Sequence, residues 1–343
     1  MLVTRLRNQR LSETALRRPH DVVSWLGAVQ AQDFTGAVWG LALRMREPTA
    51  ATIERAFADG RLLRTHVLRP TWHFVTPEDI RWMQALTGPR VLALNAYHAK
   101  NLEIDGRTSA RATSLMERAL GGGRYLTRDE LAAVLGAGRI TAAGQRLAYF
   151  VMAAELEAVI CSGPRRGKQF TYGLVAERAP RARVLPRDEA LAELARRYFQ
   201  SHGPATVHDF AWWSGLTVKD ARAGAAGVPA ELVLREPPAL DVAPDAHYLL
   251  PNYDEYLIAY RDRGAVIDRA RSRNLGIFTS REFPHHIVLG GRVAGSWRRT
   301  IGPGAAGVTL KFYGRPTATE RRALAAQAAR YGQVLGLPCR VEG

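Results

Sequence analysis

Residues 203–221 decide the predicted fold; they read Gly-Pro-Ala-Thr-Val-His-Asp-Phe-Ala-Trp-Trp-Ser-Gly-Leu-Thr-Val-Lys-Asp-Ala. Gly203-Pro204 ends a helix predicted over residues 191–200, and the residues after it begin a second, short helix. Thr217 is a typical N-cap for a third helix. Strand-forming runs come next, at residues 231–234 and 248–250. Three helices followed by a two-stranded hairpin are typical of a winged helix.

The same order of elements occurs twice more, nearer the N-terminus. The second copy consists of helices at residues 110–120 and 143–159, a capping box at 127–130, and a strand–turn–strand at 160–174. The first copy consists of helices at residues 21–29 and 49–59 and a hairpin formed by residues 62–66 and 71–75. The sequence therefore predicts three winged helices in tandem.

The pattern changes after about residue 260, where short apolar runs alternate with glycine-rich turns. These runs predict a small antiparallel β-barrel, which a helix over residues 319–335 closes. The predicted fold class is α+β: three tandem winged-helix motifs and a C-terminal β-barrel in a C-shaped monomer. The predicted domains are residues 1–100, 101–182, 183–260 and 261–343.

Composition favours a soluble protein that binds a polyanion. The 343 residues include 48 Lys and Arg against 32 Asp and Glu, a net charge of +16. A GC-rich genome would explain why Arg outnumbers Lys, but it would not explain the excess over acidic residues. Arginine suits phosphate because its planar fork donates two parallel hydrogen bonds. The charge therefore favours nucleic acid as the partner.

Other features of the composition exclude several classes of protein. The chain has no run of 18 apolar residues, and its first residues lack the apolar core of a signal peptide, so we expect a cytoplasmic protein without a membrane span. Cys161 and Cys339 are too few for a disulfide framework or a four-cysteine metal site. We therefore expect neither a metal nor a cofactor.

Four segments resemble one known family, the AlkZ-type DNA glycosylases. These segments are residues 29–34 (Val-Gln-Ala-Gln-Asp-Phe), 69–75 (Arg-Pro-Thr-Trp-His-Phe-Val), 250–256 (Leu-Pro-Asn-Tyr-Asp-Glu-Tyr) and 290–299 (Gly-Gly-Arg-Val-Ala-Gly-Ser-Trp-Arg-Arg). The resemblance implies the fold predicted above and the excision of bulky N7-alkylguanines or unhooking of interstrand crosslinks from double-stranded DNA. It also implies self-resistance in a producer of a DNA-alkylating antibiotic. The Gln-x-Gln form of the first segment implies that Gln30 and Gln32 are catalytic.

Two glutamines suit this chemistry because an N7-alkylated guanine is a cationic leaving group that needs no added proton. The enzyme has to stabilise an oxocarbenium-like sugar and place a water molecule, so the usual carboxylate pair is not required. Residues two apart do not share a face of a helix. Gln30 and Gln32 can therefore converge only at a helix end or in an extended turn, and we expect residues 29–33 at a helix C-terminus.

Nearby residues are candidates for support of the reaction. Asp33 is either a base or electrostatic stabiliser, or simply a helix-end or turn residue. Thr71 and His73 share one face of the predicted hairpin, either toward DNA or as structural residues. Asp254 and Glu255 are interpreted as an ion-pair hinge between the third winged helix and the barrel.

Two hairpin tips, residues 164–168 and 279–286, are expected to reach the DNA. The second contains Phe283 and Pro284, which are residue types that wedge between base steps. Adjacent histidines in a strand point to opposite faces, so His285 and His286 do not predict a metal site. The complete set of predicted DNA contacts is Arg69, Arg165, Arg166, Lys168, Arg281, Phe283, His285, His286, Arg298 and Arg299.

Two alternatives to a glycosylase remain from the sequence. The first is a DNA-binding regulator or antibiotic-sequestering protein without catalysis. The second is a metal-dependent nuclease, which the lack of a clustered Asp/Glu motif disfavours.

Overall fold

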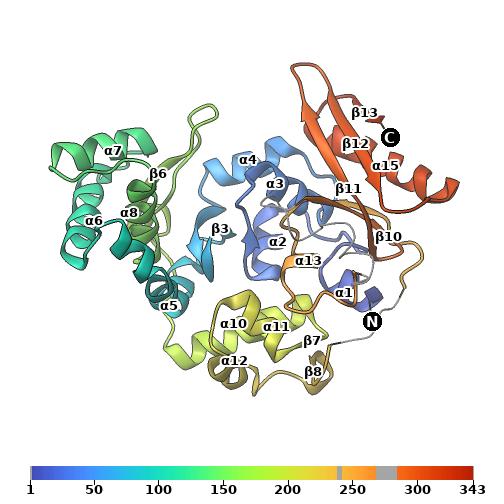
Figure 1. The fold of residues 1–343 in the computed structure, drawn as a ribbon, viewed down its shortest axis with the longest axis horizontal. Coiled ribbons are helices and arrows are strands. Elements are labelled where there is room, and N and C mark those ends of the chain that lie inside the picture. Colours follow the sequence, from blue (N-terminus) through green and yellow to red (C-terminus); the bar gives the residue numbers. More distant parts are fainter. Residues whose placement is uncertain (1, 238–241, 268–283, 343) are drawn as a thin grey trace.

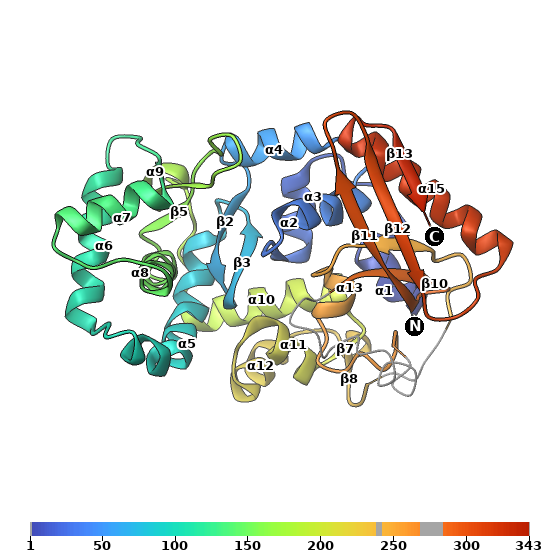
Figure 2. The same ribbon diagram turned by 45° about the horizontal axis from the view of Figure 1, so that its top comes forward.

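The computed structural model describes residues 2–237, 242–267 and 284–342, and its elements form four neighbouring groups (Figure 1). The first helices and strands lie in the middle, with α5–α8 on one side and the C-terminal sheet on the other. The group α10–α12 lies below them, and Figure 2 shows α10 running beneath α2. None of the helices in these ranges is long and apolar enough to cross a lipid bilayer.

The first group follows α1 (Leu2–Asn8) and has the order helix, strand, helix, helix, strand, strand. Its elements are α2 (Pro19–Leu26), β1 (Val29–Gln30), α3 (Phe34–Leu43), α4 (Ala50–Ala58), β2 (Leu63–Val67) and β3 (Arg69–Val75). The strands form one sheet in the order β1-β3-β2.

The expected placement of residues 29–33 at a helix C-terminus is wrong. The preceding helix α2 ends at Leu26, where Gly27 adopts φ +84°, a conformation that glycine tolerates better than other residues. The Asp33 side chain then accepts a hydrogen bond from Gly36 N and caps the start of α3. The segment is thus an extended link between two helices, and part of it pairs with β3.

The second group repeats this order. The long helix α5 (Ile80–Asn101) leads into α6 (Gly106–Leu120), β4 (Leu126–Thr127), α7 (Arg128–Ala137), α8 (Gln145–Leu156), β5 (Ile160–Ser162), β6 (Thr171–Leu174) and α9 (Val175–Arg178). The predicted capping box at Thr127 is confirmed, because its hydroxyl accepts from Glu130 N while Glu130 accepts from Thr127 N.

The third group departs from the predicted pattern at its strands. It consists of α10 (Arg187–His202), β7 (Ala205–Thr206), α11 (Val207–Ser214), α12 (Val218–Ala225), the 3-10 helix η1 (Ala230–Leu232) and β8 (Val233–Leu234). Thr217 caps α12 as predicted. The hairpin predicted from residues 231–234 and 248–250 does not form, because β8 pairs in parallel with β7 and β9 (Tyr248–Leu250) pairs with β10.

The C-terminal strands form an open sheet within the described residues, and not the predicted antiparallel barrel. The order is β13-β12-β11-β10-β9. The remaining elements of this region are α13 (Glu255–Ile258), β10 (His285–Leu289), β11 (Arg292–Ile301), β12 (Ala306–Phe312), α15 (Ala318–Leu335) and β13 (Cys339–Glu342). Strand β13 follows a helical crossover and therefore lies parallel to β12.

This sheet shares a hydrophobic core with the first group of elements. Trp39 of α3 contacts Tyr331 of α15 with ring centroids 5.1 Å apart, and Tyr331 contacts Trp297 of β11 at 5.6 Å. All three side chains are buried. The packing holds the start of the chain against its C-terminal part.

A buried ion pair fixes the same contact. Asp254 accepts two hydrogen bonds of 2.8 Å from the Arg44 guanidinium, and the side chains are 1% and 2% exposed. Burial by itself would lower the pKa of Arg44, but the Asp254 carboxylate more than compensates and raises it. Asp254 therefore forms an ion pair, but its partner is Arg44, the C-cap of α3 in the first group, so the pair is not the predicted hinge between the third winged helix and the barrel.

We expect Asp254→Ala to destabilise the protein by about 3–5 kcal/mol, because Arg44 would remain buried without a counterion. Urea unfolding followed by circular dichroism measures this loss. The matched control is Glu54→Ala, which removes an exposed carboxylate 3.8 Å from Arg165 and should change stability by less than about 0.5 kcal/mol. Equal effects of the two substitutions would contradict the importance of the buried pair.

Candidate active site

Gln30 lies in β1 and is held at both its backbone and its side chain. It pairs with His73 of β3, and its backbone N–H donates to Glu255 Oε1 at 3.1 Å. Its side-chain oxygen accepts a hydrogen bond of 3.0 Å from Arg69 Nη2. The residue is 8% exposed, and these charged neighbours show that it is not enclosed by apolar packing.

Gln32 lies on the surface, and its amide oxygen accepts from Trp72 N at 3.3 Å. The residue between the glutamines is fixed more tightly. Ala31 N donates to Trp72 O at 2.7 Å, and Ala31 O accepts from Arg64 Nε at 2.9 Å. Both glutamine side chains thus bond to groups of β3, although the two residues are only two apart.

Arg64 is a contributor that sequence reasoning missed. Its guanidinium lies over the rings of Trp72 and Phe170, 4.3 and 4.5 Å from their centroids. Burial lowers the pKa of Arg64 to about 10, against the opposing effect of Glu155, so it is cationic at neutral pH. Every residue of β2 is buried, so the strand does not alternate between a buried and an exposed face. Such an alternation could not have indicated from the sequence that Arg64 supports the Gln-x-Gln segment.

Asp33 is a helix cap whose carboxylate is already engaged. Besides the bond from Gly36 N, it accepts hydrogen bonds of 2.7 and 2.8 Å from Arg299 Nη2 of β11. Burial alone would raise the pKa of Asp33, but the hydrogen bonds and charge of Arg299 lower it below its ordinary value. Asp33 is thus a helix-end residue, as one of its two interpretations from the sequence has it.

Thr71 and His73 lie close together on β3, as their alternation predicts. His73 is fully buried, and its Nδ1 lies 2.9 Å from the carbonyl oxygen of Thr71, which an Nδ1–H group can bond. Burial, with Arg69 nearby, lowers the pKa of His73 well below its ordinary value, so the ring is neutral. His73 Nε2 and Thr71 Oγ1 have no hydrogen-bond partner in the part of the chain that the structure describes.

A small cavity of about 10 Å³ adjoins Gln30, and its lining also includes Asp33, Asn252 and Glu255. This volume is about the smallest that holds one water molecule. Asn252 Oδ1 is inaccessible to solvent and has no hydrogen-bond partner among the described residues. The cavity therefore combines the size of a water molecule with polar groups that can bond it.

The predicted DNA contacts occupy different environments. Arg166, Lys168 and Arg298 are exposed, whereas Arg165 is partly buried against Phe34 and Phe170. Arg166 also forms an exposed ion pair with Glu130 at 2.7 Å. Arg69 and Arg299 are partly buried and bond to Gln30 and Asp33, as described above. Arg281 and Phe283 lie outside the described residues.

The two histidines of the second predicted tip belong to the sheet instead. His285 begins β10, and its Nδ1 accepts from Asn252 N at 2.9 Å. His286 is fully buried, which corrects its prediction as a DNA contact because no duplex reaches it in this arrangement. Burial lowers the pKa of His285 to about 4 and that of His286 to about 3, so both are neutral at neutral pH.

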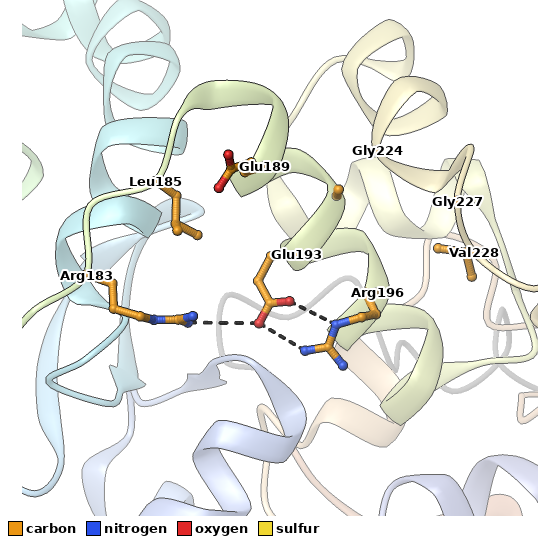
Figure 3. Close-up of a pocket in the computed structure, with 9 residues that line it drawn as sticks. Arg183, Leu185, Glu189, Glu193, Arg196, Gly224, Gly227 and Val228 are labelled. Carbon is orange, nitrogen blue, oxygen red and sulfur yellow. Dashed lines mark hydrogen bonds and ion pairs between the residues drawn. The ribbon is translucent and has the colours of Figure 1, made fainter.

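A larger cavity, of about 420 Å³, lies between α10, α12 and the segment that precedes α10 (Figure 3). Glu193 lies between Arg183 and Arg196, at 3.9 and 2.9 Å, so the charges in its wall offset one another. It shares no lining residue with the small cavity at Gln30. Within the described residues, no three His, Cys, Asp or Glu side chains are grouped to hold a metal ion.

Comparison with known proteins agrees with the resemblance in the four segments. The family model described as DNA glycosylase AlkZ-like matches residues 23–334, and the chain belongs to this family. A relative from Streptomyces sahachiroi, named interstrand DNA cross-link repair glycosylase, is 30% identical over 226 residues. That match covers 62% of this chain and 59% of the relative, so the chain spans less than two thirds of it.

A solved structure has the same fold. The Streptomyces sahachiroi DNA glycosylase AlkZ superimposes with a TM-score of 0.78, over 99% of this chain and 98% of that one. The sequences are 24% identical in this comparison, so it supports the fold alone.

The pairing of Asp33 with Arg299 predicts a pH-dependent contribution to stability. Because the folded-state pKa of Asp33 is lowered, the pair stabilises the protein above the unfolded pKa of about 3.9 and loses its effect as the pH falls through the folded value. We expect Arg299→Gln to lower the free energy of unfolding by about 1 kcal/mol at pH 7. The loss should become progressively smaller in acid. Urea unfolding at several pH values measures this loss of stability. Arg298→Gln, a substitution of the exposed neighbouring residue, is the control. A cost that does not change with pH would contradict the assignment.

Proposed function

We propose that this protein is a monofunctional DNA glycosylase that hydrolyses the N-glycosidic bond of N7-alkylguanine in double-stranded DNA. The observation that carries the proposal is the convergence of two glutamines on β3. Gln30 and Gln32 both bond to that strand, at 3.0 and 3.3 Å, although their spacing would separate them on a helix. Membership of the AlkZ-like family supports the same activity.

The proposed reaction begins with the departure of a leaving group that already carries a positive charge. Alkylation at N7 weakens the bond to C1′, so the base leaves as a neutral species without an acid from the protein. The sugar develops oxocarbenium character, and water attacks C1′ and loses a proton to solvent or a nearby acceptor. Gln30 and Gln32 would hold the water and the sugar in position. The cavity of about 10 Å³ beside Gln30 supports a site for that water.

DNA binding is proposed to come from the basic surface and from the three helical groups, which we interpret as winged helices. The first two groups have the element order of that motif, while in the third the described strands β7 and β8 pair in parallel and not as a hairpin. Exposed Arg166, Lys168 and Arg298, with partly buried Arg165, are the proposed phosphate contacts. With a net charge of +16, affinity should fall steeply with salt. We propose that the protein acts as a monomer around the duplex.

The proposed biological role is repair of bulky adducts or interstrand crosslinks. The relative from Streptomyces sahachiroi is named for cross-link repair, and both glutamines of the Gln-x-Gln form are present here. We extend this to self-resistance against a DNA-alkylating antibiotic. A panel of adducts, from N7-methylguanine to crosslinked duplexes, tests which lesion is preferred.

Product analysis tests the enzymatic proposal directly. A glycosylase releases the modified base and leaves an abasic site, whereas a DNA-binding regulator only shifts the duplex on a gel. We expect free N7-methylguanine and no strand cleavage until alkali is added. Release of no base from any adduct, with the duplex still bound, would favour the regulator.

Substitution of the glutamines tests the site. Gln30→Ala and Gln32→Ala should each lower the single-turnover rate by about 10²–10³-fold, because each removes a positioned dipole. The matched control is Gln333→Ala, an exposed glutamine on α15, which should keep the wild-type rate. Circular dichroism checks that the variants are folded. Full activity in both single variants would remove the assignment of the site.

A further inference from the structure

The orientation of the Gln30 carboxamide is defined by the chemistry of its partner. A guanidinium group can only donate hydrogen bonds, so the atom 3.0 Å from Arg69 Nη2 has to be the amide oxygen. The amide nitrogen consequently faces away from Arg69. Among the described residues it donates to no acceptor, and it is not one of the unpaired atoms that solvent cannot reach, so its hydrogens are accessible to a ligand.

Gln32 follows the same rule with a weaker contact. A backbone N–H also only donates, which assigns the oxygen of Gln32 to Trp72 N at 3.3 Å. This bond is longer than the one at Gln30, and Gln32 is exposed. Gln32 can therefore turn when DNA arrives, whereas the orientation of Gln30 depends on a charged and partly buried partner.

Arg69 is poorly placed for contact with a phosphate. It is the first residue of β3, it follows Leu68 in a turn with φ +63°, and its side chain packs at the end of α11. A Cβ atom added at Gly215 would lie 3.6 Å from Arg69 Cγ and 2.0 Å from Leu68 O, which shows how closely the two segments approach. Burial lowers the pKa of Arg69, against the effect of Glu255, but a guanidinium remains charged at neutral pH.

We propose that Arg69 is a positioning residue, not a phosphate contact, and that it presents the Gln30 amide as a hydrogen-bond donor to the substrate or to the oxygen of the attacking water. This inference rests on the proposed glycosylase function. With its oxygen held by Arg69, Gln30 does not accept the proton that the water loses. The proton passes to solvent or to another acceptor, and Gln30 acts as a positioned hydrogen-bond donor and not as a base.

The first test separates positioning from phosphate binding. The probe is a duplex with one N7-methylguanine, cleaved under single-turnover conditions with saturating protein. Arg69→Ala should slow base release by about 10²-fold, because the amide is free to turn, while the salt dependence of binding stays that of the wild type. Arg69→Lys should recover part of the rate, since an ammonium group can still donate to the amide oxygen. Arg298→Ala provides the comparison for binding, with a salt slope reduced by about one.

The second test separates positioning from a general effect on the fold. In a Gln30→Ala background, adding Arg69→Ala should slow the reaction by less than about twofold, because the amide that Arg69 orients is gone. A purely structural role would slow both backgrounds equally.

The third test decides between donor and acceptor. Gln30→Glu keeps the shape and offers Arg69 a carboxylate, so the protein should fold at least as well, but it has no N–H group. We expect it to be as slow as Gln30→Ala. A Gln30→Glu variant with wild-type activity would show that an acceptor is sufficient and would overturn the proposal.

Other outcomes are equally distinct. If Arg69→Ala keeps the wild-type rate at saturation and loses about one unit of salt slope, Arg69 is a phosphate contact and the proposal fails while the glycosylase function stands. If the wild-type protein releases no base, the proposed function fails and this inference fails with it. If Arg69→Ala does not fold, Arg69→Lys and Gln30→Glu decide the question.

Discussion

The Glu255 carboxylate is the constraint on which the site depends. Its Oε1 accepts the backbone N–H of Gln30 at 3.1 Å, and its Oε2 accepts the indole N–H of Trp213 at 2.8 Å. Glu255 is 1% exposed, and a buried carboxylate is costly unless such donors surround it. Its neighbour Asp254 pairs with Arg44. One short segment thus joins the first group of elements to the third and holds β1 in place.

This arrangement gives the two glutamines different freedom. The backbone and the side chain of Gln30 are both bonded, to Glu255 and Arg69. The exposed side chain of Gln32 accepts one hydrogen bond from the described part of the chain, of 3.3 Å, from Trp72 N. In the proposed reaction, one fixed and one adjustable amide would hold the reaction geometry and leave space for different substituents on the base.

Local signals predicted the parts of the fold that depend on local interactions. The caps at Thr127 and Thr217 are where the sequence placed them, because a cap bonds only to the next turn of its own helix. Helix α3 was missed because it is apolar on all sides, so it shows no helical periodicity. The predicted barrel and the third hairpin failed because strand pairing depends on contacts distant in sequence, such as β9 with β10.

The sequence by itself determined the α+β class, many of the helices, the caps at Thr127 and Thr217, the positive charge and the Gln-x-Gln segment with its family resemblance. It did so because these properties belong to short stretches of chain. Only the tertiary structure decided that residues 29–33 are extended, that Asp33 binds Arg299 and that Arg69 binds Gln30. Asp33 and Arg299 are 266 residues apart in the sequence, and Gln30 and Arg69 are 39 apart. The orientation of an amide depends on which hydrogen-bond donor the folded chain brings to it.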